Sequence, residues 1–290
     1  MFYILSLAMG VLISVMVAFN GGLTGAYGVY TATVIIHVVG LCLISFFVKR
    51  KELFVKNIAW YLYLGGAIGV LTTVFNNFSF GRISVSAILA LGLLGQSVAG
   101  IIIDHFGLFG MKKYKFNAIK LAGFVWIFIG LVTMISDFHI IAVFVSFFAG
   151  VNIALSRILN ARLSEFTSVR VSTFFNYFIG LIVSLIVFVF IGRGEVRFEN
   201  FSLSSNWWIY LGGVLGVMVV FLGNIVAVKI SAYYLALFIF VGQVVTGILI
   251  DMFLMETFSF SILIGGLFVA TGLVFNLGID ERIRKKETNK

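Results

Sequence analysis

Gly95-Gln96-Ser97-Val98-Ala99-Gly100-Ile101-Ile102-Ile103-Asp104 is matched at seven of ten positions by Gly242-Gln243-Val244-Val245-Thr246-Gly247-Ile248-Leu249-Ile250-Asp251. The two segments lie 147 residues apart, and shorter matches follow the same order along the chain. One of them pairs Gly10-Val11 with Gly150-Val151. A set of matches in the same order indicates an internal duplication of the whole chain.

The composition places this duplication in a membrane. Of the 290 residues, 61% are hydrophobic and 11% are charged, and the mean hydropathy is +1.16. Soluble domains have about 45–50% apolar and about 25% charged residues, so a soluble domain is excluded. A membrane-spanning helix needs about 20 mostly apolar residues. Ten apolar runs meet that need, at 2–19, 30–48, 58–80, 83–103, 116–136, 138–156, 171–191, 207–228, 231–250 and 259–279.

The sequence therefore predicts an all-α integral membrane protein of ten transmembrane helices. The first five-helix repeat spans 1–137 and the second spans 138–290. Because each repeat has an odd number of crossings, the two repeats must cross the membrane in opposite orientations. Inverted repeats of this kind are typical of secondary transporters, which bind substrate near the bilayer midplane between the repeats.

The charges predict the orientation. Lys and Arg number 20 against 11 Asp and Glu, an excess that in a soluble protein would favour a nucleic-acid partner. In a membrane protein, basic residues gather in cytoplasmic loops. With both termini in the cytoplasm, 17 of the 20 basic residues lie on that side. We expect a multi-pass protein of the cell membrane with no nucleic-acid partner.

The motifs resemble those of a known family. Asn20-Gly21-Gly22-Leu23, His37 with Gly40, and Gly95-Gln96 leading to Asp104-His105-Phe106-Gly107-Leu108-Phe109-Gly110 together resemble the YdcZ-like branch of the drug/metabolite transporter superfamily. The resemblance covers the whole chain in a fused two-repeat form. It implies a cavity lined by the first, third and fourth helices of each repeat. Substrates across that superfamily include amino acids, sugars, nucleotides and cationic drugs.

Amide side chains inside the apolar runs are the candidates for substrate binding. An amide without a partner in hydrocarbon costs several kcal/mol, so these groups must face protein or water. The candidates are Gln96, Gln243, Asn76, Asn77, Asn152 and Asn224. The alternative for each is a hydrogen bond between helices, worth about 0.6 kcal/mol on average.

Charged and polar residues at the predicted helix ends are candidates for gates. Asn20 and Asn160 lie where the first and sixth runs end, and a helix C-cap is the alternative for both. Asp104 and Asp251 end repeat-related helices, where the helix dipole disfavours an anion. We expect two gate pairs, Asp104 with Lys229 and Asp251 with Arg82, against the alternative of ordinary solvated helix ends.

His37 is a possible proton site, although a neutral packing role is the alternative because Tyr177 occupies the related position. The resemblance bears on the substrate, because the small multidrug exporters of the same superfamily need a carboxylate in the first helix to exchange a cation for a proton. The first and sixth runs contain no acidic residue, which argues against a cationic-drug/proton antiporter. We therefore expect a neutral, zwitterionic or aromatic metabolite to be transported, and a lipid flippase or scramblase is the alternative.

No catalytic constellation, metal-ligand cluster or phosphate-binding loop is visible in the sequence, so we expect no enzyme activity, no cofactor and no metal. The expected partners are a small-molecule substrate and membrane lipid, and the protein is a monomer or a homodimer. The chain has no proline, so we expect any helix break to fall at a glycine.

Overall fold

The computed structural model describes residues 1–53, 57–113, 119, 121–134, 139–195, 203–253 and 260–288. Its α-helices are α1 (Phe2–Tyr27), α2 (Val29–Ser45), α3 (Gly65–Ser79), α4 (Val85–Phe106), α5 (Leu121–Met134), α6 (Ile140–Phe166), α7 (Val169–Val187), α8 (Gly212–Val226), α9 (Ala232–Phe253) and α10 (Phe260–Thr288). Each of the ten predicted runs overlaps one of them. Five described helical segments, which include all of α1 and α6, are long and apolar enough to cross a membrane. The all-α membrane fold is thus confirmed.

Glycine marks several of the points where helices begin and end. Gly28, with a φ of 85°, separates α1 from α2, and Gly107, with a φ of 65°, ends α4. Both angles lie in the left-handed region that glycine adopts without steric cost. Short 3-10 turns precede α3 and α8 and pass into the α-helix at the related glycines Gly65 and Gly212.

α1 and α6 are longer than predicted, as is α10, which continues to Thr288. The apolar runs ended at residues 19 and 156, whereas α1 continues to Tyr27 and α6 to Phe166. The polar and glycine residues that ended the runs are accommodated within the helices because they pack against protein. At Gly21, for example, an added Cβ would lie 2.1 Å from a ring carbon of Phe80, so the glycine permits a close helix contact.

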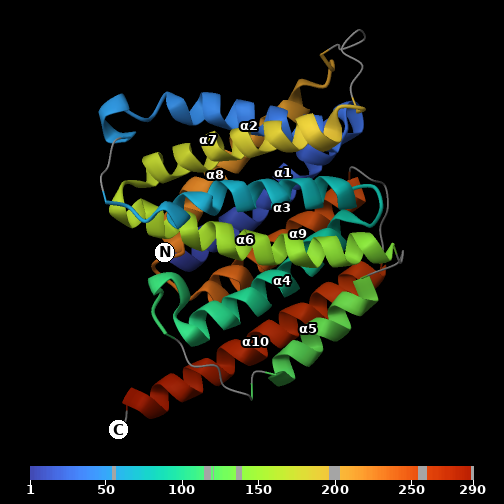
Figure 1. Cartoon of the computed structure of the whole chain (residues 1–290). Helices are drawn as coiled ribbons and strands as arrows, with labels where there is room; N and C mark the ends of the chain where they lie inside the picture. The colour runs from blue at the N-terminus through green and yellow to red at the C-terminus, as the bar shows by residue number, and fades with distance from the viewer. Residues whose placement is uncertain are drawn as a thin grey trace.

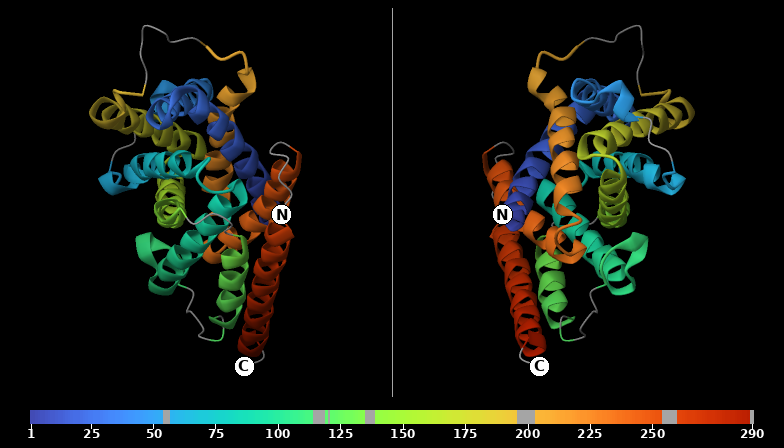
Figure 2. Two further views of the ribbon diagram at one scale, coloured as in Figure 1. Left: turned by 90° about the vertical axis from the view of Figure 1, so that its right-hand side faces the viewer. Right: turned by 90° about the vertical axis from the view of Figure 1, so that its left-hand side faces the viewer.

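The helices form three groups (Figure 1). α2 and α7 lie together at one edge, and α5 and α10 form a pair at the opposite edge. Between them lie α1, α3, α4, α6, α8 and α9. Figure 2 shows α10 running alongside α5 at the rim of the molecule. The central group, with α2 and α7, encloses the site described below.

Helices of the two repeats pack closely through glycines at related positions. An added Cβ at Gly10 of α1 would lie 2.0 Å from the Ile239 carbonyl oxygen of α9. At Gly150 of α6 it would lie 1.9 Å from the Gly92 carbonyl oxygen of α4. The α1–α9 and α6–α4 contacts are therefore pseudosymmetric copies, and each joins one repeat to the other.

Candidate functional site

A cavity of about 150 Å³ lies among six helices: α1, α2, α3, α6, α7 and α8. This differs from the lining implied by the family resemblance, which included the fourth helix of each repeat in place of the second. Close packing explains the difference. An added Cβ at Gly95 of α4 would lie 2.0 Å from the Phe147 carbonyl oxygen of α6, and one at Gly242 of α9 would lie 2.2 Å from the Leu7 carbonyl oxygen of α1. α4 and α9 thus lie behind α6 and α1.

The cavity has a polar wall and an apolar wall. The polar wall is formed by α3, α6 and α7, with Thr72, Thr73, Asn76, Ser156, Arg157, Asn160 and Asn176. The apolar wall is formed by α1, α2 and α8, with Ile13, Met16, Ile36, Val219, Val220 and Gly223. Asn20, His37 and Asn224 are polar groups on the helices of the apolar wall, and Tyr177 lies on α7.

The two walls are repeat-related copies that have diverged. Val219 and Val220 stand at the positions of Thr72 and Thr73, shifted by 147 residues. Met16 stands in the first repeat where Ser156 stands in the second. The two repeats therefore share the frame of the cavity but differ in the polarity of the walls that they contribute.

Arg157 lines the cavity, although the sequence did not predict it as a site residue. The hydropathy pattern places it among the 17 basic residues on the cytoplasmic side, but the extension of α6 places it inside that helix. Its Nη2 donates a hydrogen bond to Oε1 of Gln96 over 3.0 Å. Its spacing from Ser156 and Asn160 along one helix face was the signal in the sequence. Moving one residue out of a 17 to 3 excess leaves the predicted orientation unchanged.

The two glutamines have unequal surroundings. Gln96 is 2% exposed and contacts the cavity indirectly, through Arg157. Gln243 is 1% exposed, and its Oε1 has no hydrogen-bond partner among the described residues. Val17, the first-repeat counterpart of Arg157, explains the difference because it offers Gln243 no donor. Neither glutamine lines the cavity.

Asn20 and Asn160 line the cavity from inside α1 and α6, so their interpretation as C-caps is wrong. Each contacts a glycine of the other repeat. An added Cβ would lie 1.9 Å from Asn20 Oδ1 at Gly212, and 2.2 Å from Asn160 Oδ1 at Gly65. Asn160 also donates to Asn176 Oδ1 over 2.7 Å.

Of the remaining candidate asparagines, two line the cavity and two do not. Asn76 and Asn224 line the cavity, whereas Asn77 and Asn152 do not. Asn77 donates to Thr33 Oγ1 and Asn224 to Thr173 Oγ1, each over 3.2 Å. These are repeat-related hydrogen bonds, so both side chains tie helices together whatever their role toward substrate.

His37 and Tyr177 occupy related positions and lie side by side, with ring centroids 5.8 Å apart. His37 is 4% exposed, and its Nδ1 lies 2.8 Å from the Thr33 carbonyl oxygen. That geometry fits a ring whose Nδ1–H donates to the carbonyl. Each ring packs on a glycine of the other repeat, His37 on Gly180 and Tyr177 on Gly40.

Backbone N–H groups of α9 stabilise the carboxylate of Asp104 at the end of α4. Its carboxylate oxygens accept hydrogen bonds from the N–H groups of Ala232 and Tyr233, over 3.2 and 3.1 Å. The anion thus lies at the positive N-terminal end of α9, which offsets the unfavourable end of α4. Lys229 is exposed just before α9. Its predicted pairing with Asp104 stays a prediction.

The structure describes only one side chain of the second predicted gate pair, Asp251 with Arg82. The side chain of Asp251 lies outside the described residues. Arg82 is exposed, donates to the Phe78 carbonyl oxygen, and places its guanidinium carbon 4.1 Å from the centre of the Phe78 ring.

Two buried apolar clusters occupy related positions. The Leu62 cluster contains Leu62, Leu159 and Leu163, and the Ile209 cluster contains Ile209, Leu23, Tyr27, Ala32 and Ile36. Leu62 corresponds to Ile209 and Leu163 to Leu23 in the two repeats. Both clusters lie next to cavity-lining asparagines in sequence, Leu163 after Asn160 and Leu23 after Asn20.

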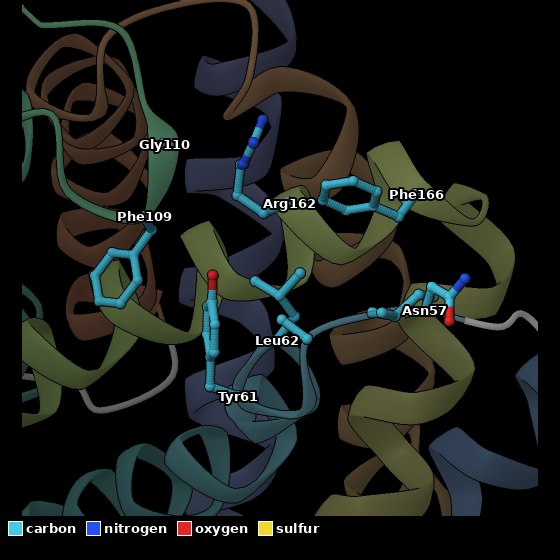
Figure 3. Close-up of a pocket in the computed structure, with 9 residues that line it drawn as sticks. Asn57, Tyr61, Leu62, Phe109, Gly110, Arg162 and Phe166 are labelled. Carbon is cyan, nitrogen blue, oxygen red and sulfur yellow. The ribbon is translucent and has the colours of Figure 1, made fainter.

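A second pocket, of about 620 Å³, has Leu62 among its lining residues (Figure 3). Asn57, Tyr61, Phe109, Gly110 and Phe166 line it together with Arg162, which forms an ion pair with Glu165. On the predicted topology this pocket opens to the cytoplasm. Leu62 thus belongs both to the Leu62 cluster and to the lining of this pocket, and Leu159 of the same cluster precedes the cavity-lining Asn160 in sequence.

Comparisons with known proteins agree with this architecture. A family model described as "Putative inner membrane exporter, YdcZ" matches residues 1–133 and again residues 141–275. The two matches coincide with the two repeats and confirm the resemblance found in the sequence. No curated protein matches the chain. A solved structure titled "Crystal structure of protein" has a TM-score of 0.67 at 12% identity, over 95% of this chain and 96% of that one, and shares the fold.

Proposed function

The chain belongs to the YdcZ family of membrane proteins, and on that premise we propose that it exports a small metabolite across the cell membrane by alternating access. The observation that carries the proposal is the cavity between the two repeats, with repeat-related apolar clusters near it. Both termini face the cytoplasm in this proposal, and the repeats 1–137 and 138–290 are the units that move.

The cavity supports transport of a solute smaller than a drug. Pockets for drug-sized ligands measure about 300–1,000 Å³. A cavity of about 150 Å³ matches one that holds a molecule the size of benzene. One chain supplies every wall, so transport needs no second copy.

The apolar clusters support the two gates. In the proposed cycle the Leu62 cluster closes the cavity toward the cytoplasm, and the Ile209 cluster closes it toward the outside. The outer closure is reinforced by polar contacts. The hydroxyls of Tyr27 and Tyr210 bond to each other, and both accept from the Ser204 N–H, over 2.8 and 3.0 Å. The two clusters open in turn as the repeats rock against each other.

The glycine contacts support such a rocking motion. His37 on Gly180 and Tyr177 on Gly40 are paired ring-on-glycine contacts between α2 and α7. Because neither glycine has a side chain, the two helices can shift without a change of rotamer. His37 is the proposed proton site in this cycle, and the substrate contacts come from the walls of the cavity.

A thermal-shift screen of the purified protein tests the proposal. The panel contains amino acids, small carboxylates, nucleobases, amines and lipid headgroups. A transporter is stabilised by at least one soluble metabolite, and Val220→Phe, which fills the cavity from its apolar wall, removes that stabilisation. Val38→Phe, which alters a side chain 41% exposed on α2, is the matched control and leaves it intact. Stabilisation by lipid headgroups alone would instead indicate a flippase.

A further inference from the structure

Among the described residues that line the cavity, with His37 neutral, only Arg157 carries a formal charge. Its guanidinium has five N–H donors, and the described part of the chain provides one hydrogen bond, to Gln96. The ion pairs of the described residues involve Arg162 and Arg170, not Arg157. The cavity is therefore lined by a cation with more N–H donors than the described residues use.

The depth of Arg157 makes this unusual. It is the eighteenth of the 27 residues of α6, about 14 Å from the nearer end of the helix at 1.5 Å per residue. A cation at such a depth is costly and marks a functional site by default. Because Arg157 lines the cavity and the described residues give it no anionic partner, a ligand in the cavity is a candidate for its counter-charge.

The opposite wall shows what the rest of that ligand is. Met16, Val219 and Val220 offer only apolar surface, where their repeat counterparts offer hydroxyl groups. A ligand that contacts both walls has an anionic end and an apolar end. The volume of about 150 Å³ limits it to on the order of ten non-hydrogen atoms.

We propose that the substrate is a small carboxylate with a short apolar body. The two carboxylate oxygens accept parallel hydrogen bonds from the Arg157 guanidinium, a geometry that arginine provides and lysine does not. Gln96 positions the guanidinium from behind, and the apolar body packs against Met16, Val219 and Val220. This inference rests on the proposed transport function and specifies its substrate class.

Asn224 Oδ1 and Thr72 Oγ1 also lack partners in the described residues, although both residues line the cavity. An oxygen acceptor of this kind suits the ammonium group of an amino acid. The proposal therefore covers amino acids with apolar side chains as well as simple carboxylic acids, and the probes below separate the two.

Four probes with the same branched body test the charge requirement: 3-methylbutanoate, L-leucine, 3-methylbutan-1-ol and 3-methylbutylamine. Binding to the purified full-length protein is measured by titration calorimetry. We expect 3-methylbutanoate or L-leucine to bind at least tenfold more tightly than the alcohol and the amine. Tighter binding of L-leucine identifies an amino acid, and tighter binding of 3-methylbutanoate identifies a simple acid.

Variants of α6 test the role of Arg157. We expect Arg157→Gln to weaken carboxylate binding ten- to a hundredfold and Arg157→Lys to weaken it less. Arg162→Gln, which removes a partly exposed cation at the mouth of the second pocket, leaves binding unchanged. The comparison of the four probes on the unmodified protein does not depend on these variants folding.

Several results overturn the inference. Equal binding of the carboxylate and the alcohol does so, as does tighter binding of the amine. Binding of inorganic phosphate in place of both carboxylates also does so. If other soluble metabolites stabilise the protein while both carboxylates fail, the transporter proposal stands and the carboxylate inference falls. If no soluble metabolite binds at all, the transport function itself fails.

Discussion

Gln96 and Gln243 are repeat-related residues with opposite surroundings. In one half Gln96 accepts a hydrogen bond from Arg157, whereas in the other Gln243 Oε1 is buried without a partner in the described structure and Val17 stands where the arginine would be. The glycine contacts around them are nearly identical: Gly10 of α1 packs against α9, and Gly150 of α6 packs against α4. The duplication has thus kept its scaffold symmetric while its chemistry became one-sided.

This contrast has a physical origin. A glycine at a helix crossing is constrained by the backbone of its neighbour, so it can hardly change in either repeat. A residue that faces the cavity is constrained only by its ligand, so one copy is free to change. We therefore expect substitutions in the scaffold to have equal effects in the two repeats, and substitutions around the cavity to have unequal effects.

The largest effect is expected at the scaffold glycines. Gly10→Ala and Gly150→Ala each place a methyl group within 2.0 Å of a backbone carbonyl oxygen. Overpacking against a rigid backbone costs about 3 kcal/mol, which lowers the melting temperature by about 10 °C. Thermal unfolding in detergent measures this. Gly25→Ala is the control, because nothing lies within 4 Å of its added Cβ. A large difference between the first two variants would break the symmetry of the scaffold.

The next largest effect on stability is expected at one of the two glutamines and not at the other. Gln96→Leu removes a hydrogen bond to a charged group and is expected to cost about 2 kcal/mol. Gln243→Leu removes a side chain whose Oε1 has no partner, so its expected cost is about zero. The same unfolding measurement compares them. Equal losses of stability would mean that the two halves are chemically alike.

A smaller loss of stability is expected at Asp104, and it distinguishes a helix-capping role from the predicted ion pair with Lys229. Asp104→Ala removes two hydrogen bonds to the N-terminus of α9 and is expected to cost about 1 kcal/mol. Lys229→Ala is expected to change stability by less than about 0.5 kcal/mol. If Lys229→Ala matches Asp104→Ala, and the double variant adds nothing, the ion pair predicted from the sequence is the dominant contact.

The smallest effect concerns the two symmetric amide contacts. Asn77→Ala and Asn224→Ala are each expected to cost about 0.6 kcal/mol, the average for hydrogen bonds between membrane helices. Double-mutant cycles with Thr33→Val and Thr173→Val isolate the two couplings. Coupling energies that differ by more than about 1 kcal/mol would mean that these two contacts have diverged between the repeats, as the cavity has, and are not part of the symmetric scaffold.

Much of the fold was predictable because hydropathy and repetition report directly on helices. All ten helices and the duplication follow from patterns that the chain repeats. The ends of α1 and α6 were wrong because a polar residue lowers the hydropathy of a run whether it ends the helix or faces a cavity. Arg157 was missed for the same reason: its charge was interpreted as a loop signal.

The site was less predictable because it depends on how each helix is rotated and packed. Gln96 and Gln243 are equally polar in the sequence, yet α4 and α9 lie behind the cavity-lining helices because Gly95 and Gly242 permit close contact. Asn20, Asn76, Asn160, Asn224 and His37 do line the cavity. The sequence predicted these residues as site candidates, but only the structure shows that they line one cavity.

The central claim is that the cavity between the repeats opens to each side of the membrane in turn. It is tested most directly by cysteine accessibility in a Cys42→Ser background. Thr73→Cys and Val220→Cys place related reporters on the polar and apolar walls, and Gly25→Cys and Lys112→Cys report the outer and cytoplasmic faces. Vesicles of each orientation are treated with a membrane-impermeant thiol reagent. We predict that both wall reporters are labelled from both sides and that each face reporter is labelled from one side only. Wall reporters that are labelled from a single side, or from neither, would contradict the account.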